Sequence, residues 1–271
     1  GRFKLAFWGH GKNYQSLNPD GLLEYFKKKI SINVDWWFTY TKDGRDIIAE
    51  LGFDTQCITS VENSIDTKSL SETLNKLSQS DLRQTMEQLS LNGDHVAIYC
   101  GGMYGDKKMP FLINTCKHIR KLLPSFEVLF IGDGPDSACV KEFECEFEWV
   151  RFLGSVTGNE RVKFFAISKV MLMPGLVGLA VLDSFALAVP MVSTDITIHS
   201  PEFSYLEDGY NGVVTEFDER KYTQAVVDIL HDDEYRLRLV QGCLESSNKY
   251  TVENMALNFS QGIVACLGVV K

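Results

Sequence analysis

The chain has 271 residues, of which 45% are hydrophobic and 11% aromatic, enough to build one large domain or two small ones. Its 27 basic and 36 acidic residues give a formal net charge of −9, which argues against a DNA-binding or other nucleic-acid-binding protein but permits a local nucleotide site. The apolar content also argues against disorder, and no apolar run approaches the roughly 20 residues of a membrane span. Seven scattered cysteines without a CxxC pair argue against a disulfide framework or a zinc site. We therefore expect reduced, mostly buried thiols in a cytoplasmic protein.

The first part of the chain predicts short strands alternating with helices. Strands are expected over 4–8, 34–40 and 57–61, and helices over 21–32 and 43–51. Gly52 follows the second helix and is a C-cap signal. Residues 67–94 are polar and are expected to form helices that join two halves of the molecule.

From His95 the alternation becomes regular. Apolar strands are expected over 95–101, 126–132, 149–153, 170–173 and 190–193, and helices over 111–123, 160–168, 179–188, 221–231, 233–244 and 252–267. Apolar strands that alternate with helices predict an α/β fold with a parallel sheet covered on both faces. Ligands of such sheets bind outside the carboxyl ends of the strands, and glycines gather at those ends here.

Two loops at predicted strand ends are candidates for binding a phosphorylated ligand. In the first, Gly101 and Gly102 lead to Lys107 and Lys108, so that backbone can approach a ligand and an ammonium can meet a phosphate. In the second, residues 174–183 run from a buried strand through a glycine loop into a helix, whose start could bind an anion. The alternatives are a solvated surface lysine and an ordinary loop between a strand and a helix.

A third candidate is His10, which stands between Gly9 and Gly11 after the first strand. A histidine at a strand end can meet a ligand, although a purely structural role is the alternative. His199, before Ser200 and Pro201, is a similar but weaker candidate.

Several motifs occur in one fixed order along the second half of the chain. They are the glycine loop with Lys107, the GDGP run at 132–135, VRFLG at 150–154, AVPMV at 188–192, Pro-Glu at 201–202 and LEDGYNG at 206–212. In this order they resemble the donor half of family 4 glycosyltransferases, which are retaining enzymes of the GT-B fold that include bacterial surface-polysaccharide enzymes. The resemblance implies two Rossmann-like domains, of which the first is represented by a remnant.

The resemblance extends to both ends of the chain. Asn63-Ser64-Ile65-Asp66 resembles the segment that ends the family's N-terminal domain, and the last helix resembles the one that crosses back to it. We therefore expect residues 1–90 to be the C-terminal part of the acceptor domain with a linker, 91–250 the nucleotide-sugar donor domain, and 251–271 the crossing helix. The family places several strands before the His10 loop, so the resemblance implies an N-terminally truncated chain that is inactive alone.

The resemblance also implies residue roles. His10 would face the transferred sugar and Lys107 the diphosphate, both as catalytic residues, with Lys108 in reserve. The remaining donor-binding positions would be Gly102, Asp133, Leu153, Gly154, Gly175, Gly178, Leu179 and Asp183. The base would lie near Asp133 and Gly154, and Asp183 would hold the ribose.

The implied function is transfer of a sugar from a UDP- or GDP-sugar to a hydroxyl of a glycan or lipid-linked acceptor, with retention and without a metal or other cofactor. Polysaccharide biosynthesis in the cytoplasm is expected, with peripheral contact to the inner face of the membrane through the missing N-terminal part. Two positions depart from the family pattern: Gly175 replaces the first glutamate of its E-x7-E signature, and Gly102 an arginine. A non-catalytic nucleotide-sugar-binding or scaffold protein is therefore the alternative, and a GT-B sugar-nucleotide epimerase a less favoured one.

Overall fold

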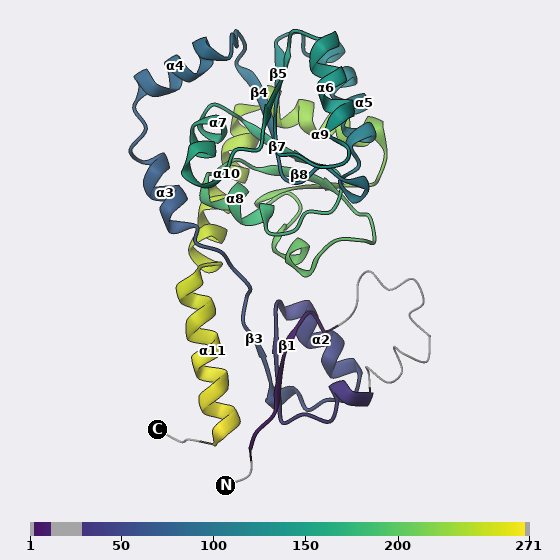
Figure 1. The fold of residues 1–271 in the computed structure, drawn as a ribbon, viewed down its shortest axis with the longest axis vertical. Helices are drawn as coiled ribbons and strands as arrows, with labels where there is room; N and C mark the ends of the chain where they lie inside the picture. The colour runs from purple at the N-terminus through teal and green to yellow at the C-terminus, as the bar shows by residue number, and fades with distance from the viewer. Residues whose placement is uncertain (1–2, 12–28, 269–271) are drawn as a thin grey trace.

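The computed structural model describes residues 3–11 and 29–268, so most of the helix predicted over 21–32 lies outside the described residues. Two parallel sheets form two lobes, one above the other in Figure 1. The smaller sheet has three strands in the order β1-β2-β3, and the larger has six in the order β6-β5-β4-β7-β8-β9. The predicted α/β class is therefore confirmed.

The small lobe is built on strands of three or four residues. They are β1 (Ala6–Gly9), β2 (Trp36–Thr39) and β3 (Ile58–Ser60), with helix α2 (Lys42–Glu50) and the short turn η1 (Thr55–Cys57). Helix α2 begins where the Thr41 hydroxyl accepts a hydrogen bond from the Gly44 amide, an N-cap that satisfies one otherwise unpaired donor. Two small apolar clusters, one on Trp36 and Phe38 and one on Trp37 and Ile48, stabilise this lobe.

Two helices lead from the small lobe to the large one, as the polar stretch predicts. They are α3 (Lys68–Leu74) and α4 (Gln79–Gln88). Helix α4 begins with a capping box, in which the Ser78 hydroxyl accepts from the Asp81 amide and the Asp81 carboxylate accepts from the Ser78 amide.

The large lobe contains the main core. Its strands are β4 (His95–Cys100), β5 (Phe126–Ile131), β6 (Val150–Gly154), β7 (Val170–Met173), β8 (Met191–Thr194) and β9 (Gly212–Thr215). Helices α5 (Met109–Leu122), α6 (Ser137–Glu146) and α9 (Glu219–His231) pack on one face, and α7 (Val162–Ala166), α8 (Ala180–Ala186) and α10 (Asp233–Lys249) on the other (Figure 1). Because both faces are covered, β5, β7 and β8 are buried along their whole length.

Sequence patterning did not predict three of the elements in this lobe that have four or more residues. They are α6, β9 and the 3₁₀ segment η4 (Pro201–Tyr205). Strand β9 has only four residues, of which Gly212 is one, and it extends the sheet at an edge where only Gly212 is fully buried. A strand this short and mixed in composition has no periodicity to read.

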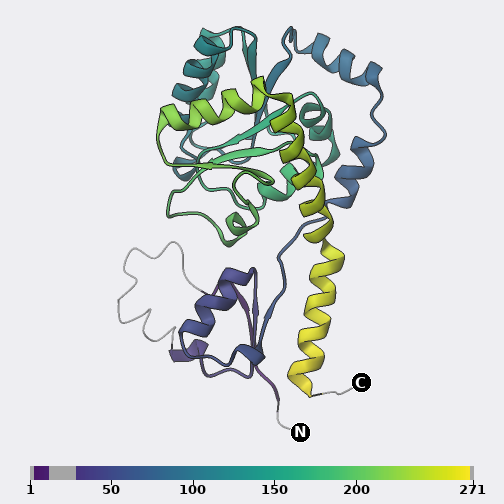
Figure 2. The same cartoon turned by 180° about the vertical axis from the view of Figure 1, so that it is seen from behind.

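The last helix, α11 (Val252–Leu267), leaves the large lobe and lies along the small sheet, as both views show (Figures 1 and 2). Phe259 stacks on Phe38 of β2, with ring centroids 4.9 Å apart, and meets Trp8 edge-on. The two lobes are thus joined by the chain at α3 and again by α11.

All seven cysteines lie in the described residues and are free there. The expectation that they are mostly buried was wrong. Only Cys100, Cys116 and Cys243 are buried, whereas Cys145 is exposed on the polar side of α6.

Candidate functional site

The strand order of the large sheet reverses between β4 and β7. From β4 the chain adds β5 and β6 on one side, and from β7 it adds β8 and β9 on the other. At such a switch point the loops leaving the two central strands diverge and open a crevice at the carboxyl edge of the sheet. The loops that leave β4 and β7 are the two phosphate-binding candidates predicted from the sequence.

Lys107 lies in the loop after β4 and is 5% exposed. It is in the 3₁₀ turn η2 (Gly105–Lys107), and its ammonium donates to the Leu176 carbonyl in the loop after β7. The ammonium also lies 5.6 Å from the centre of the Tyr104 ring. Burial lowers the pKa of Lys107 to about 8, and neighbouring Asp106 opposes this shift. Lys107 is therefore a positioned cation that loses its charge close to neutral pH.

The next lysine has a different role. Lys108 has left-handed backbone (φ 57°) and stands at the N-cap position of α5. Its backbone turns the chain from the loop into the helix, which begins with Met109 and Pro110. The structure thus distinguishes the buried Lys107 from Lys108, which is only half-buried.

Gly175 packs directly on the loop that carries Lys107. A Cβ at position 175 would lie 2.2 Å from the Asp106 carbonyl oxygen and 2.6 Å from the Lys107 Cα, and the Leu176 amide donates to that same carbonyl at 2.9 Å. No side chain fits there while the two backbones are in contact. Gly175 is thus a packing requirement, and the loop of Lys107 occupies the space that a side chain at 175 would need.

The loop after β7 is held in place from β8. Thr194 donates its hydroxyl to the Pro174 carbonyl at 2.6 Å. The His199 ring accepts from the Val177 amide at Nδ1 (3.3 Å) and lies 2.6 Å from the Thr194 carbonyl at Nε2, so Nε2 carries the proton. Burial lowers the pKa of His199, which favours the neutral form, and the Phe203 ring stacks on the His199 ring with centroids 3.7 Å apart. His199, the weaker histidine candidate from the sequence, thus holds the glycine loop after β7 in place through its hydrogen bonds.

Asp183 is 4% exposed on α8 and forms an ion pair with Arg161, 2.7 Å from Oδ1 to Nη2. Burial raises the pKa of Asp183 to about 6, while Arg161 opposes the rise. Sequence reasoning missed Arg161, which ends the 3₁₀ turn η3 (Gly158–Arg161). Its position directly before the apolar run of α7 was the available signal, because such a position places a side chain at the edge of the core.

The remaining candidates lie around the same edge of the sheet. Asp133 follows β5, is exposed and accepts from the Gly134 amide at 2.8 Å, and this bond, with one from the Ser137 hydroxyl, lowers its pKa. Leu153 and Gly154 end β6, and the Gly154 carbonyl accepts from the Gly132 amide at 2.8 Å.

The other glycine candidates lie in the two switch-point loops. Gly102 follows β4, and its carbonyl accepts from the Tyr99 hydroxyl at 2.5 Å. Gly178 (φ 62°) and Leu179 lead into α8, a helix of seven residues whose N-cap makes no side-chain hydrogen bond. The candidate donor-site residues of the large lobe are thus gathered on the loops after β4, β5, β6 and β7.

His10 lies in the other lobe, directly after β1. Its ring packs against Tyr40, with centroids 4.4 Å apart and the two ring planes tilted by 42°. Tyr205 of η4 reaches this region from the large lobe, because its hydroxyl donates to the carbonyls of Tyr40 and Asn63, each at 3.2 Å. The Asn63 side chain in turn donates to the Glu202 carboxylate at 2.7 Å. The His10–Tyr40 pair therefore lies beside a polar contact between the lobes.

Within residues 3–11 and 29–268, no group of three or more His, Cys, Asp or Glu side chains is arranged to hold a metal ion. Among the helices of the same residues, none is both long and apolar enough to cross a membrane.

Several solved structures share this fold at low sequence identity. HepE from Anabaena, solved with UDP, shares 14% identity at a TM-score of 0.75, over 97% of this chain and 72% of that one. A glycosyltransferase from Rickettsia africae shares 13% identity at a TM-score of 0.72, over 90% of this chain and 67% of that one. The pneumococcal O-GlcNAc transferase GtfA, solved with UDP and GlcNAc, shares 13% identity at a TM-score of 0.67, over 89% of this chain and 47% of that one.

The fold and the arrangement of loops at its switch point define the class: this is an α/β protein of the GT-B fold. Residues 94–232 match the family model for Glycosyl transferases group 1, and the chain belongs to that family. A search of the curated proteins found no match.

Proposed function

We propose that this protein transfers a sugar from a nucleotide diphosphate sugar to a hydroxyl of a glycan or lipid-linked acceptor. The observation that carries the proposal is the position of Lys107, a buried cation at the switch point of the sheet in contact with the glycine loop after β7. Membership of the group 1 family supports the reaction class. UDP in the similar HepE structure supports UDP as the first nucleotide to test.

In the proposed reaction the bond between the sugar C1 and the β-phosphate oxygen breaks, and a bond from C1 to the acceptor oxygen forms. The electron pair of the broken bond leaves with the diphosphate, which gains negative charge, and the proton of the acceptor hydroxyl passes to a phosphate oxygen of the leaving group or to solvent. A fixed cation beside that charge stabilises the transition state more than the ground state, and removing one such donor typically costs about 10²-fold or more in rate. Lys107 would supply that cation, with the amides near Gly178 and Leu179 as further donors. We propose that the reaction retains the anomeric configuration and needs no divalent metal, as the family resemblance implies.

The nucleoside would extend from Lys107 toward the ends of β5 and β6, with the base near Asp133 and Gly154. The ion pair with Arg161 engages Oδ1 of Asp183, so Asp183 would accept from the ribose hydroxyls at Oδ2 while the ion pair is kept. We infer that Arg161 orients Asp183 for this role. His10 would face the sugar from the small lobe, beside the Tyr205 contact, so that closure of the lobes would complete the site.

Calorimetric titration with UDP, GDP, dTDP and ADP, with and without magnesium, tests the donor site directly. We expect one nucleotide to bind with micromolar affinity and no magnesium dependence. Lys107→Ala should weaken that affinity at least tenfold, while Lys121→Ala, an exposed lysine in the last turn of α5, should leave it unchanged.

The pKa of Lys107 adds a second test, which is the pH dependence of nucleotide affinity. The ammonium is charged below its pKa of about 8 and neutral above it, so affinity should fall between pH 7 and pH 9 in the unmodified protein. Lys107→Ala should abolish this pH dependence. Equal affinities for the unmodified protein and Lys107→Ala at pH 7 would contradict the proposed phosphate site.

A second function, nucleotide-sugar binding without turnover, is favoured by one observation. Glutamate cannot be accommodated at position 175, because its Cβ would overlap the Asp106 carbonyl, so the carboxylate that the family pattern places near the donor sugar has no room here. Reintroducing glutamate by Gly175→Glu is therefore expected to disrupt the loop and cannot separate the two functions. Incubation with the preferred UDP- or GDP-sugar separates them, because a transferase releases the nucleotide on adding an acceptor and a binding protein does not.

A further inference from the structure

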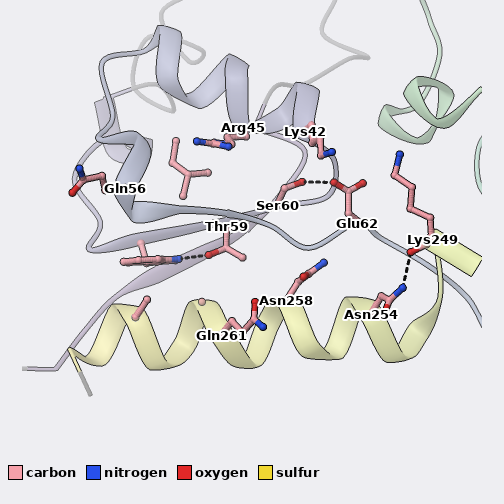
Figure 3. Close-up of a pocket in the computed structure, with 14 residues that line it drawn as sticks. Lys42, Arg45, Gln56, Thr59, Ser60, Glu62, Lys249, Asn254, Asn258 and Gln261 are labelled. Carbon is pink, nitrogen blue, oxygen red and sulfur yellow. Dashed lines mark hydrogen bonds between the residues drawn. The ribbon is translucent and has the colours of Figure 1, made fainter. Parts of the chain in front are cut away.

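The small lobe contains a polar groove that has no part in the proposed donor site. It has a volume of about 640 Å³ and lies between β3, α2 and α11. Figure 3 shows β3 running along its middle, α2 on one side and α11 on the other. Trp36 forms part of its floor, with its indole nitrogen donating to the Thr59 hydroxyl at 2.9 Å.

Three cations line this groove: Lys42 and Arg45 of α2, and Lys249 at the end of α10. All three are exposed, and none forms an ion pair with any described residue. The one carboxylate of the lining is Glu62, which accepts from the Ser60 hydroxyl at 3.2 Å. Burial raises the pKa of Glu62, while the hydrogen bond from Ser60 and the charges of Lys42 and Lys249 oppose that rise. The lining therefore has three cations and one carboxylate. A chain of net charge −9 therefore carries a groove that is locally positive.

Amide side chains make up much of the remaining wall. Asn258 donates its amide to the Val61 carbonyl at 3.2 Å, and Asn254 donates to the carbonyls of Asn248 and Lys249. These bonds hold both side chains in place and engage only their amide nitrogens, so their carbonyl oxygens are left to accept. Gln56 and Gln261 add a further donor and acceptor pair each. Hydroxyl groups, which both donate and accept, are the natural partners of such a wall.

The groove is long enough for a chain of sugars. Its lining on α11 extends from Asn254 to Ala265, which at the helical rise corresponds to about 16 Å. Two of its cations, Lys42 and Lys249, lie at the end nearest the large lobe, and Gln56 lies at the far end (Figure 3). Gly262 lets α11 approach the sheet, because a Cβ there would lie 2.5 Å from the Thr59 hydroxyl and from the Phe38 ring.

We propose that this groove binds an extended oligosaccharide that carries carboxylate or phosphate groups, as a site separate from the donor site. The cations would pair with the anionic groups at the end nearest the large lobe, and the amides would bind hydroxyls along the rest of the chain. A membrane surface fits less well, because membrane-binding faces combine cations with projecting apolar side chains, whereas amides flank the cations here. That the bound chain is the acceptor rests on the proposed function, but the class of ligand does not.

Binding of a defined acidic oligosaccharide tests the groove. Hexagalacturonate is the probe, with maltohexaose as its neutral counterpart and inorganic phosphate as the isolated anion, each measured by calorimetry. We expect hexagalacturonate to bind, to weaken as sodium chloride is raised, and to lose at least tenfold in affinity in Lys42→Ala/Arg45→Ala/Lys249→Ala. Maltohexaose and phosphate alone should bind at least tenfold more weakly than hexagalacturonate.

A control variant removes the same charges elsewhere. Lys68, Lys76 and Arg83 are exposed on or beside α3 and α4, and their triple alanine variant should keep full hexagalacturonate affinity. Both triple variants should keep the UDP affinity of the unmodified protein, which separates failure of the groove from failure of the donor site. Equal affinity in the two triple variants, or no binding of hexagalacturonate, would overturn the proposal. So would groove-dependent binding to phosphatidylglycerol vesicles in place of the oligosaccharide.

Discussion

The two sheets of this protein differ in how they are stabilised. In the large lobe, β5, β7 and β8 are buried on both faces, and helices on each side form one continuous core. In the small lobe, β1 alternates between exposed and half-buried residues, and Leu5 and Trp8 are each more than half exposed. The small sheet packs on α2 through one cluster and on α11, which the large lobe supplies, through the other. The large lobe therefore has a core of its own, whereas one of the two clusters of the small lobe depends on its attachment.

The largest expected effect is a loss of stability when a core side chain of the large lobe is truncated. Phe130 of β5 is fully buried between Tyr99 and Phe143, so Phe130→Ala should lower the free energy of unfolding by about 4 kcal/mol. The small-lobe counterpart, Phe38→Ala, removes the ring that stacks on Phe259 and should cost about 3 kcal/mol.

Hydrogen exchange distinguishes the two variants. Phe130→Ala should accelerate amide exchange throughout the large sheet, whereas Phe38→Ala should accelerate it in β1 to β3 and α11 and leave β4 to β8 protected. Equal acceleration of both sheets by Phe38→Ala would show that the lobes unfold as one unit.

A smaller effect is expected from the buried ion pair of the candidate site. Arg161→Met leaves the Asp183 carboxylate buried without its partner, which should cost about 3 kcal/mol at pH 7.5. The pKa of Asp183 is about 6 in the folded protein, above the ordinary aspartate value of 3.8. A raised pKa means that the folded state binds the proton more tightly, so this group's contribution to stability falls as pH rises from about 4 to 6.

Without Arg161 the pKa of Asp183 should rise further, and the fall in stability should extend to higher pH. Arg161→Met should therefore be nearly as stable as the unmodified protein at pH 5 and much less stable at pH 7.5, as thermal unfolding would measure. Asp183→Asn in the Arg161→Met background should remove the difference between the two pH values. A pH-independent loss in Arg161→Met alone would show that packing, and not charge, is responsible.

The smallest expected effect is a loss of stability when a side chain is added where α11 packs on the small sheet. Alanine usually stabilises an α-helix by about 1 kcal/mol relative to glycine, but at position 262 its Cβ would overlap Phe38 and Thr59. Gly262→Ala should therefore lower the free energy of unfolding of the small lobe by about 1–2 kcal/mol, measured by urea denaturation. Ser260→Ala, on the exposed side of the same helix, should change it by less than about 0.5 kcal/mol. A Gly262→Ala variant as stable as Ser260→Ala would mean that the helix shifts without cost.

Much of the candidate donor site could be predicted because glycines and charged residues at strand ends are local signals. The loops of Lys107 and of Gly175 follow apolar strands in the sequence, and strands of that kind pair in parallel and place their ends at one edge. Arg161 could not be found in the same way, because its partner Asp183 is 22 residues away and only the packing of α7 against the sheet brings the two together. The groove on β3 could not be predicted from the sequence either, because α2, β3, α10 and α11 contribute to it from separate parts of the chain.

The sequence by itself determined the α/β class, the order of most strands and helices, the loop that carries Lys107 and the glycine loop that leads into the helix of Asp183, because these depend on periodicity and on residues next to one another in the chain. Only the tertiary structure decided that position 175 has no room for a side chain, that the ammonium of Lys107 is buried, and that Asp183 is paired. Each of these depends on how closely two distant segments approach, and that distance is set by the packing of the whole lobe.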